Sequence, residues 1–164
     1  MKSFRFTVKG RPVPWKRLRT KGKSRFPAPG QTEAKDAVRA AYKAAEGTAF
    51  APKGQPVVLT VHAVFALPES MRKSDPRKMG DRHTMTPDGD NLVKLVKDAL
   101  NGLAYVDDCQ VSDCHVRKQW SDYNATHITI ELPNYENIAR TKASKASATT
   151  PAPTDHNANK ERRL

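Results

Sequence analysis

The segment VVLTVHAVFAL, residues 57–67, decides the fold of this 164-residue chain. Its odd-numbered residues are all apolar, and they would share one face of a strand because successive side chains alternate. Val58, Val64 and Ala66 make the second face largely apolar as well. A strand of this kind belongs inside a sheet that is covered on both faces. On the second face we expect His62 to be a buried or edge-solvated histidine rather than a metal ligand.

Patterns on either side of this strand predict an α/β domain, more closely an α+β domain with a mixed sheet and two main helices. The predicted elements are strands over 4–9, 110–120 and 125–132, a helix from Thr32 to Gly47, and a helix over 91–102. Asp90 or Asn91 can cap the start of this last helix, and Gly102 can cap its end. We expect the last two strands to form an antiparallel hairpin. The segments 10–30 and 68–89 read as long loops, which are usually functional or disordered.

We place the domain at residues 1–135 and expect residues 136–164 to be a basic, low-complexity, disordered tail. This tail holds six of the 29 basic residues and three of the 17 acidic ones. From residue 139 onward its only large apolar residue is Leu164. It therefore cannot bury enough apolar surface to offset the entropy of ordering it. We expect it to add nonspecific electrostatic contact with DNA, or nothing.

Composition excludes several classes of protein. No apolar run approaches the roughly 18 residues of a membrane-spanning helix, and the alternating start from Met1 to Phe6 argues against a secretory signal peptide. Cys109 and Cys114 are too few for a disulfide scaffold and lack the spacing of a structural zinc site. We therefore expect a cytoplasmic protein with reduced thiols and no association with a membrane.

The net charge of +12 is concentrated in one segment, which carries eight basic residues and no acidic ones between Lys9 and Arg25. Such density suits a polyanion, because neutralising phosphates releases condensed counterions. Interspersed prolines and Trp15 disfavour a plain helix and could offer stacking surfaces. The alternative is a solvated surface that only keeps the chain soluble. The candidate DNA contacts are Arg11, Lys16, Arg17, Arg19, Lys21, Lys23 and Arg25, and a second basic group lies within residues 72–82.

Two acidic pairs flank the second predicted helix. Asp88 and Asp90 lie at its entry, and Asp107 and Asp108 follow its exit. Close carboxylates repel one another unless a cation or a shared proton joins them, and hard oxygen ligands select Mg²⁺ or Mn²⁺. An extended segment would aim Asp88 and Asp90 the same way, and the second pair could fold back beside them if its strand pairs there. The alternative is that the aspartates only cap a helix and form a turn.

Lys94 lies one helical turn after Asp90 and would share its face of the helix. A lysine there can hold a phosphate or stabilise the charge that develops on a leaving oxygen. With a metal held by carboxylates, these groups suit the hydrolysis of a phosphodiester. An EF-hand is excluded, because the sixth position from Asp88 is Val93 rather than Gly and the twelfth is Ala99 rather than Glu.

The segments PDGDNLVK (87–94), DALNG (98–102) and DDCQV (107–111) resemble the RusA family of crossover junction endodeoxyribonucleases. GRPVPWKR (10–17) is similar to the start of its phage-type members, and a bacterial or prophage origin fits this resemblance. The resemblance implies a small α/β homodimer that binds four-way DNA junctions and nicks them in symmetric pairs with Mg²⁺, or Mn²⁺ in its place.

It also implies roles for particular residues. Asp88, Asp90 and Asp108 would be the catalytic, metal-binding carboxylates, Lys94 the catalytic lysine and Asp107 a supporting residue. The chain departs from the family pattern at Gly89, where a larger residue can occur, and in its C-terminal extension.

We therefore predict a Mg²⁺-dependent endonuclease that resolves Holliday junctions in DNA recombination and repair. Two alternatives stay open: a junction-binding or DNA-binding protein without catalysis, and a basic RNA-binding or ribosome-associated protein. Asp88, Asp90 and Asp108 within metal-bridging distance of one another would favour the enzyme, whereas scattered aspartates would favour the alternatives.

Overall fold

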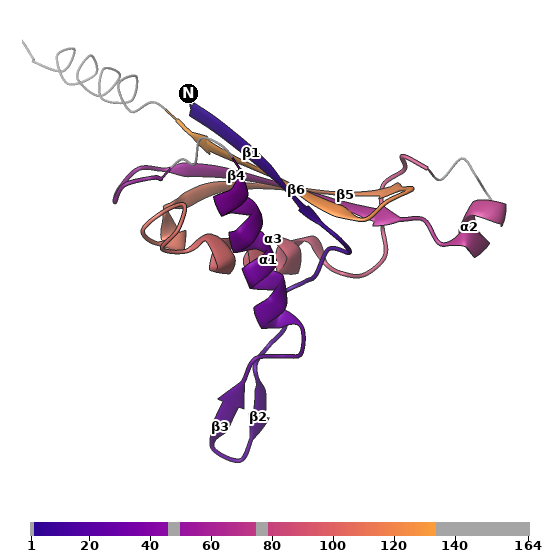
Figure 1. Cartoon of the computed structure of the whole chain (residues 1–164), viewed down its shortest axis with the longest axis horizontal. Coiled ribbons are helices and arrows are strands. Elements are labelled where there is room, and N and C mark those ends of the chain that lie inside the picture. The colour runs from indigo at the N-terminus through magenta and orange to yellow at the C-terminus, as the bar shows by residue number, and fades with distance from the viewer. Residues whose placement is uncertain (1, 46–49, 75–78, 134–164) are drawn as a thin grey trace, which may run out of the picture. The chain divides into compact units, whose positions relative to one another are not determined.

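A computed structural model describes residues 2–45, 50–74 and 79–133 of the chain. The predicted tail, residues 136–164, therefore lies entirely outside the described residues. The elements are β1 (Lys2–Lys9), β2 (Arg19–Lys21), β3 (Ser24–Phe26), α1 (Gln31–Ala44), β4 (Val57–Ala66), α2 (Glu69–Ser74), α3 (Gly89–Leu100), the 3-10 helix η2 (Asp108–Gln110), β5 (Val111–Ser121) and β6 (Ala125–Leu132). The predicted α+β fold with a mixed sheet and two main helices is confirmed (Figure 1).

The main sheet has the strand order β1-β6-β4-β5, so β4 is an inner strand as predicted. It pairs antiparallel with β6 and parallel with β5. The predicted hairpin of the last two strands is wrong, because β4 lies between them. The residues after β5 instead cross the end of β4. There the N–H of Ala66 donates to Asn124 Oδ1 at 2.9 Å, and the N–H of Leu67 donates to the carbonyl of Ser121 at 2.8 Å.

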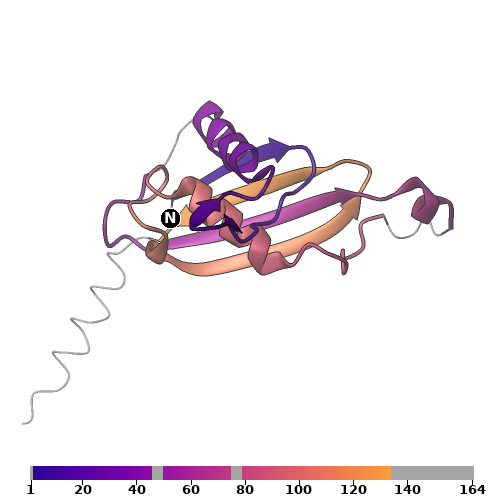
Figure 2. The ribbon, with the colours of Figure 1, turned by 90° about the horizontal axis from the view of Figure 1, so that it is seen from below.

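Helices α1 and α3 lie on the same face of the sheet (Figure 2). The apolar side chains of β4 that face them, such as Leu59 and Val61, are fully buried against residues of both helices. The prediction of cover on both faces is wrong for most of β4, since Val58, Thr60 and His62 on the other face are only half-buried. An open second face is common in sheets with antiparallel strands.

Both predicted long loops contain regular structure. The basic segment 10–30 includes the antiparallel hairpin of β2 and β3, all of whose residues are exposed. Figure 1 shows this hairpin projecting away from the sheet below α1. Residues 68–89 include the short helix α2, which has no buried residue. Within the described residues, the structure has no helix with the length and apolar character needed to cross a membrane.

Candidate active site

Helix α3 begins at the first acidic pair. Asp88 is its N-cap in an extended conformation, rather than the predicted Asp90 or Asn91, and Gly89 begins the helix. Asp90 is therefore in the first turn of the helix, so the extended segment that would aim both aspartates the same way is not formed. Both side chains are exposed, and carboxylates are favoured at a helix N-terminus by the partial positive charge there.

Gly89 allows close packing of the start of α3 against β5. A Cβ atom at this position would lie 3.0 Å from Cγ1 of Val116 in β5. Gly89 is not among the glycines with positive φ, so its backbone conformation does not itself require a glycine. The start of α3 therefore sits directly against the middle of β5, which fixes where Asp88 and Asp90 lie relative to the sheet.

Lys118 of β5 fixes the segment that leads into Asp88. Its Nζ donates to the carbonyl oxygens of Met85 at 2.6 Å and Pro87 at 2.7 Å. Hydrogen bonds from a charged donor are among the stronger ones in proteins. Sequence analysis missed this residue, because nothing in its local pattern indicates a partner more than thirty residues away. We regard Lys118 as a positioning residue for Asp88.

The basic segment is anchored to α3 at its base. The N–H of Trp15 donates to the carbonyl of Asn91 at 2.8 Å, and the ammonium of Lys94 lies 3.5 Å from the centre of the Trp15 ring. A cation over an indole face is attracted by the negative potential of the ring. The aromatic residue of the basic segment thus holds the lysine that the motif singled out, one turn from Asp90.

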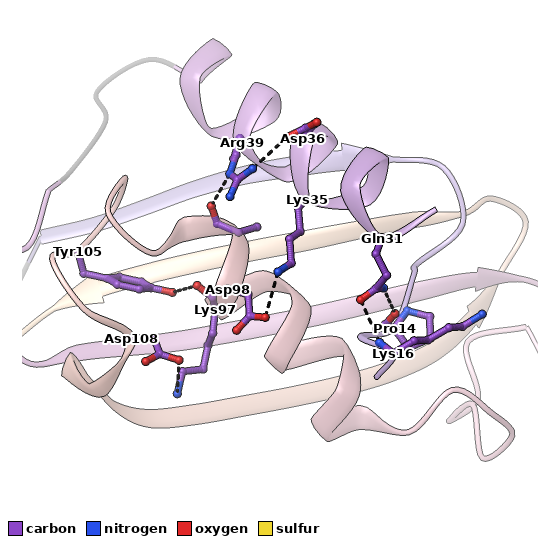
Figure 3. A network of polar contacts seen from close by, with 11 residues as sticks. Pro14, Lys16, Gln31, Lys35, Asp36, Arg39, Lys97, Asp98, Tyr105 and Asp108 are labelled. Carbon is purple, nitrogen blue, oxygen red and sulfur yellow. Dashed lines mark hydrogen bonds and ion pairs between the residues drawn. The ribbon is translucent and has the colours of Figure 1, made fainter. Parts of the chain in front are cut away.

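Gln31 at the start of α1 completes this anchor. Its side chain is 5% exposed, donates from Nε2 to the carbonyl of Pro14 at 2.8 Å and accepts at Oε1 from the N–H of Lys16 at 3.0 Å (Figure 3). Residues 14–16 are thereby held between α1 and α3. Of the predicted DNA contacts, Lys16 and Arg17 lie at this base, while Arg19, Lys21 and Arg25 lie in the exposed hairpin. The remaining two are also exposed: Arg11 precedes this base, and Lys23 lies in the turn that joins β2 to β3.

The second acidic pair lies at the other end of α3. Asp107 caps η2: its carboxylate accepts from the N–H of Cys109 at 2.9 Å, and this bond holds its pKa below the ordinary value. The carboxylate of Asp108 instead lies 3.9 Å from Nζ of Lys97 (Figure 3). Asp107 thus has a hydrogen-bond partner in the backbone, whereas the carboxylate of Asp108 has the ammonium of Lys97 beside it.

One chain does not bring the three predicted metal ligands together. Across residues 2–45, 50–74 and 79–133, no three Asp, Glu, His or Cys side chains lie close enough to hold a metal ion. Asp90 and Lys97 are about 10 Å apart along the helix axis, at 1.5 Å per residue, and Asp108 lies beside Lys97. The reason is topological: the 101–110 connection returns the chain beside the end of α3, so β5 runs back along it. The donor chemistry suits Mg²⁺, but the arrangement within one chain does not.

Comparison with known proteins identifies a family. Residues 9–131 match the family model described as "Endodeoxyribonuclease RusA". A curated relative, "Uncharacterized protein YqaN" of Bacillus subtilis (strain 168), is 40% identical over 80 residues, a match that spans 46% of this chain and 56% of that protein. The chain therefore spans little more than half the length of this relative. The family match includes the basic segment and both acidic pairs.

Proposed function

We propose that this chain, which belongs to the RusA endodeoxyribonuclease family, resolves four-way DNA junctions by paired symmetric nicks during recombination and repair. The observation that best supports this is the contact between its basic and acidic parts. The basic segment is bound to the first turns of α3 through Trp15, Asn91 and Lys94. Exposed carboxylates alone would repel a phosphate backbone, and the adjoining cations offset that repulsion.

The catalytic groups that we propose are Asp88, Asp90, Asp108 and Lys94. The three carboxylates would serve as ligands for Mg²⁺, for which Mn²⁺ could substitute, and Lys94 would stabilise the scissile phosphate or the leaving oxygen. Lys94 suits this task because Trp15 fixes its ammonium while leaving the side chain exposed. We derive no step through the metal, since a single chain does not assemble its ligands.

The expected partners are junction DNA and a second copy of the chain. We expect the protein to act in the cytoplasm and to be encoded by a bacterium or a prophage. All residues of the β2 and β3 strands are exposed, so their cations are accessible to a phosphate backbone, and the proposed DNA contacts are the seven basic residues named above. A homodimer suits a substrate with two-fold symmetry, because it carries two sites for two strands.

A junction-binding protein without catalysis is the second candidate, and one observation favours it: the aspartates are separated within the chain. A nicking assay distinguishes the two. The protein is incubated with a synthetic four-way DNA junction, a linear duplex of the same sequence and a structured RNA, with Mg²⁺ or with EDTA. Metal-dependent nicks on the junction alone support the enzyme. Tight junction binding without nicks under Mg²⁺ or Mn²⁺ supports the binding protein, and preference for RNA contradicts both.

A further inference from the structure

A pocket with a volume of about 240 Å³ lies at the end of β4 that leads to α2. One side of it is aromatic: the imidazole of His83 packs against Phe65 and Trp120, with 4.1 Å between its ring centre and each of theirs. Met71 and Met85 lie on other sides, and methionine side chains adapt readily to a ligand. Pockets for drug-sized ligands measure roughly 300–1,000 Å³, so this one suits a single flat ring system.

Hydrogen bonds fix the frame of the pocket. The N–H of His83 donates to the carbonyl of Lys118 at 3.1 Å, and the N–H of Gly10 donates to the carbonyl of Asn124 at 3.2 Å. The side chain of Asn124 is held as well, because its Oδ1 accepts from the N–H of Ala66 at 2.9 Å. These bonds join the ends of β1, β4 and β5, so the pocket is formed before a ligand arrives.

Two polar groups of the pocket lack a hydrogen-bond partner among the described residues. One is Nδ1 of His83, a residue that is 5% exposed. The other is Nδ2 of Asn124, which stays a free donor because only Oδ1 of this side chain is engaged. Unpaired buried polar atoms are rare in folded proteins and call for an explanation. Nδ1 of His83 is covered and is reached only after a small shift of the ring, so a ligand meets Asn124 first.

Arg11 supplies a cation beside these groups. Its side chain is exposed and lines the pocket, and its charge contributes to the lowered pKa of His83, which places it near that ring. None of the described residues that line the pocket is acidic. Aromatic surfaces stack on nucleobases of any kind, and a guanidinium pairs with a phosphate. The combination of aromatic rings, a free amide donor and an unopposed cation therefore suits a nucleotide.

The pocket also adjoins the first acidic pair. Met85 and Thr86 line it, and Asp88 follows Thr86 by two residues. Two residues span at most about 7 Å, which corresponds to about two nucleotides along a DNA strand. Lys118 links the two places, because its Nζ donates to the carbonyl of Met85 and its own carbonyl accepts from His83. A base in the pocket would therefore lie within about two nucleotides of a phosphate at the start of α3.

We propose that this pocket takes up one unstacked base of the bound junction beside the scissile phosphate, with Asn124 reading the edge of the base and Arg11 holding its phosphate. The proposal rests on the proposed function and adds a base preference to it. Taking a base out of the stack costs least where the stack is already interrupted, and the point of strand exchange in a junction is such a place. Stacking on the aromatic side of the pocket tolerates every base, so selection falls to Asn124.

Binding of single nucleotides tests the pocket without any cleavage. The chain has two tryptophans, Trp120 in the pocket and Trp15 at the base of the basic segment, so their indole N–H signals in NMR spectra report on the two places separately. Deoxynucleoside monophosphates at millimolar concentration should shift the Trp120 signal saturably and leave that of Trp15 in place. Deoxyribose phosphate, which has no base, should shift neither signal. An unmoved Trp120 signal, or an equal shift with deoxyribose phosphate, would overturn the proposal.

Junctions that differ only in one base beside the cut test the reading of that base. Asn124→Asp keeps the acceptor for the N–H of Ala66 but replaces the free donor with an acceptor. Cytosine presents an amino donor where thymine presents a carbonyl acceptor. The ratio of the nicking rate with cytosine to that with thymine should therefore rise about two- to tenfold, the worth of one hydrogen bond. Gln119→Glu is the matched control, because it adds the same charge beside His62 on the other face of the sheet and should keep the wild-type ratio.

The outcomes separate the pocket from the proposed function. An unchanged ratio in Asn124→Asp, beside a wild type that nicks the junction, would overturn the reading of the base and leave the proposed function standing. An equal change of the ratio in Gln119→Glu would overturn it too, because charge alone would then explain the effect. A wild type that nicks no junction would overturn the proposed function, while the nucleotide titration still decides whether the pocket binds a base.

Discussion

Replacing Gln31 with alanine should release the base of the basic segment from the helices. The side chain makes two hydrogen bonds, to the carbonyl of Pro14 and from the N–H of Lys16. At about 0.5–1.5 kcal/mol each, their loss should lower the free energy of unfolding by about 1–3 kcal/mol. Gln31→Glu keeps the acceptor for Lys16 but loses the donor for Pro14, so we expect about half that loss.

The assay is hydrogen exchange at the N–H of Trp15, together with urea unfolding. This amide bonds to the carbonyl of Asn91 and should exchange up to about tenfold faster for each 1.4 kcal/mol of lost anchoring. Gln55→Ala is the matched control, because Gln55 also donates to a proline carbonyl, that of Pro133, at 2.7 Å. Its loss should leave exchange at Trp15 unchanged. Equal protection of Trp15 in wild type and Gln31→Ala would refute the anchoring argument.

Three further outcomes are expected. Lys118→Met removes the hydrogen bonds from Lys118 to the carbonyls of Met85 and Pro87, just before Asp88. It should lower the nicking rate about tenfold or more and leave junction affinity unchanged. Reduced affinity with a normal nicking rate would contradict the positioning role. Arg25→Ala in the hairpin should reduce the slope of log affinity against log salt by about 0.9 if it contacts one phosphate, whereas Lys43→Ala on α1 should leave that slope unchanged. Burial between Phe65 and Trp120, with the Lys118 charge nearby, holds the pKa of His83 below 6.5, so the unfolded chain binds this proton more tightly than the folded one. The folded protein therefore loses stability as pH falls through the unfolded pKa of His83 towards its lower folded pKa. His83→Phe should flatten the dependence of Tm on pH between about 7 and 5. An unchanged slope would show that His83 does not cause this pH dependence.

Local sequence patterns predicted the elements well where one periodicity dominates. The apolar run of β4 indicated an inner strand, and it lies third in the sheet order. The stripe of α3 predicted a helix that ends just before Gly102, which adopts the left-handed conformation with φ of 72°. In both cases burial of one continuous apolar face determines the structure, and that face can be read from spacing alone.

Pairing between distant segments could not be read in this way. A three-residue connection between β5 and β6 favours a hairpin, but the strongly apolar β4 takes the position between them because it gains partners on both sides. Gln31 was missed for a similar reason: a single polar residue at a helix start looks exposed until Pro14 and Lys16 fold against it.

The acidic pairs show the same limit. Their spacing indicated a common site, yet the residues between them form a full helix, which separates Asp90 from Asp108. Whether spacing along the sequence becomes proximity depends on the direction in which the next strand returns, and here β5 returns alongside α3.

The most direct test of the proposed chemistry is the nicking rate of Asp90→Asn on a four-way junction, measured with saturating Mg²⁺ beside junction affinity. Asp36→Asn is the control, because Asp36 is an exposed aspartate on α1 whose ion pair with Arg39 lies away from the start of α3. We expect Asp90→Asn to lose about a hundredfold or more in rate with affinity retained, and Asp36→Asn to nick as the wild type does. Undiminished nicking by Asp90→Asn, with the junction bound equally well, would contradict the assignment of the active site to the start of α3.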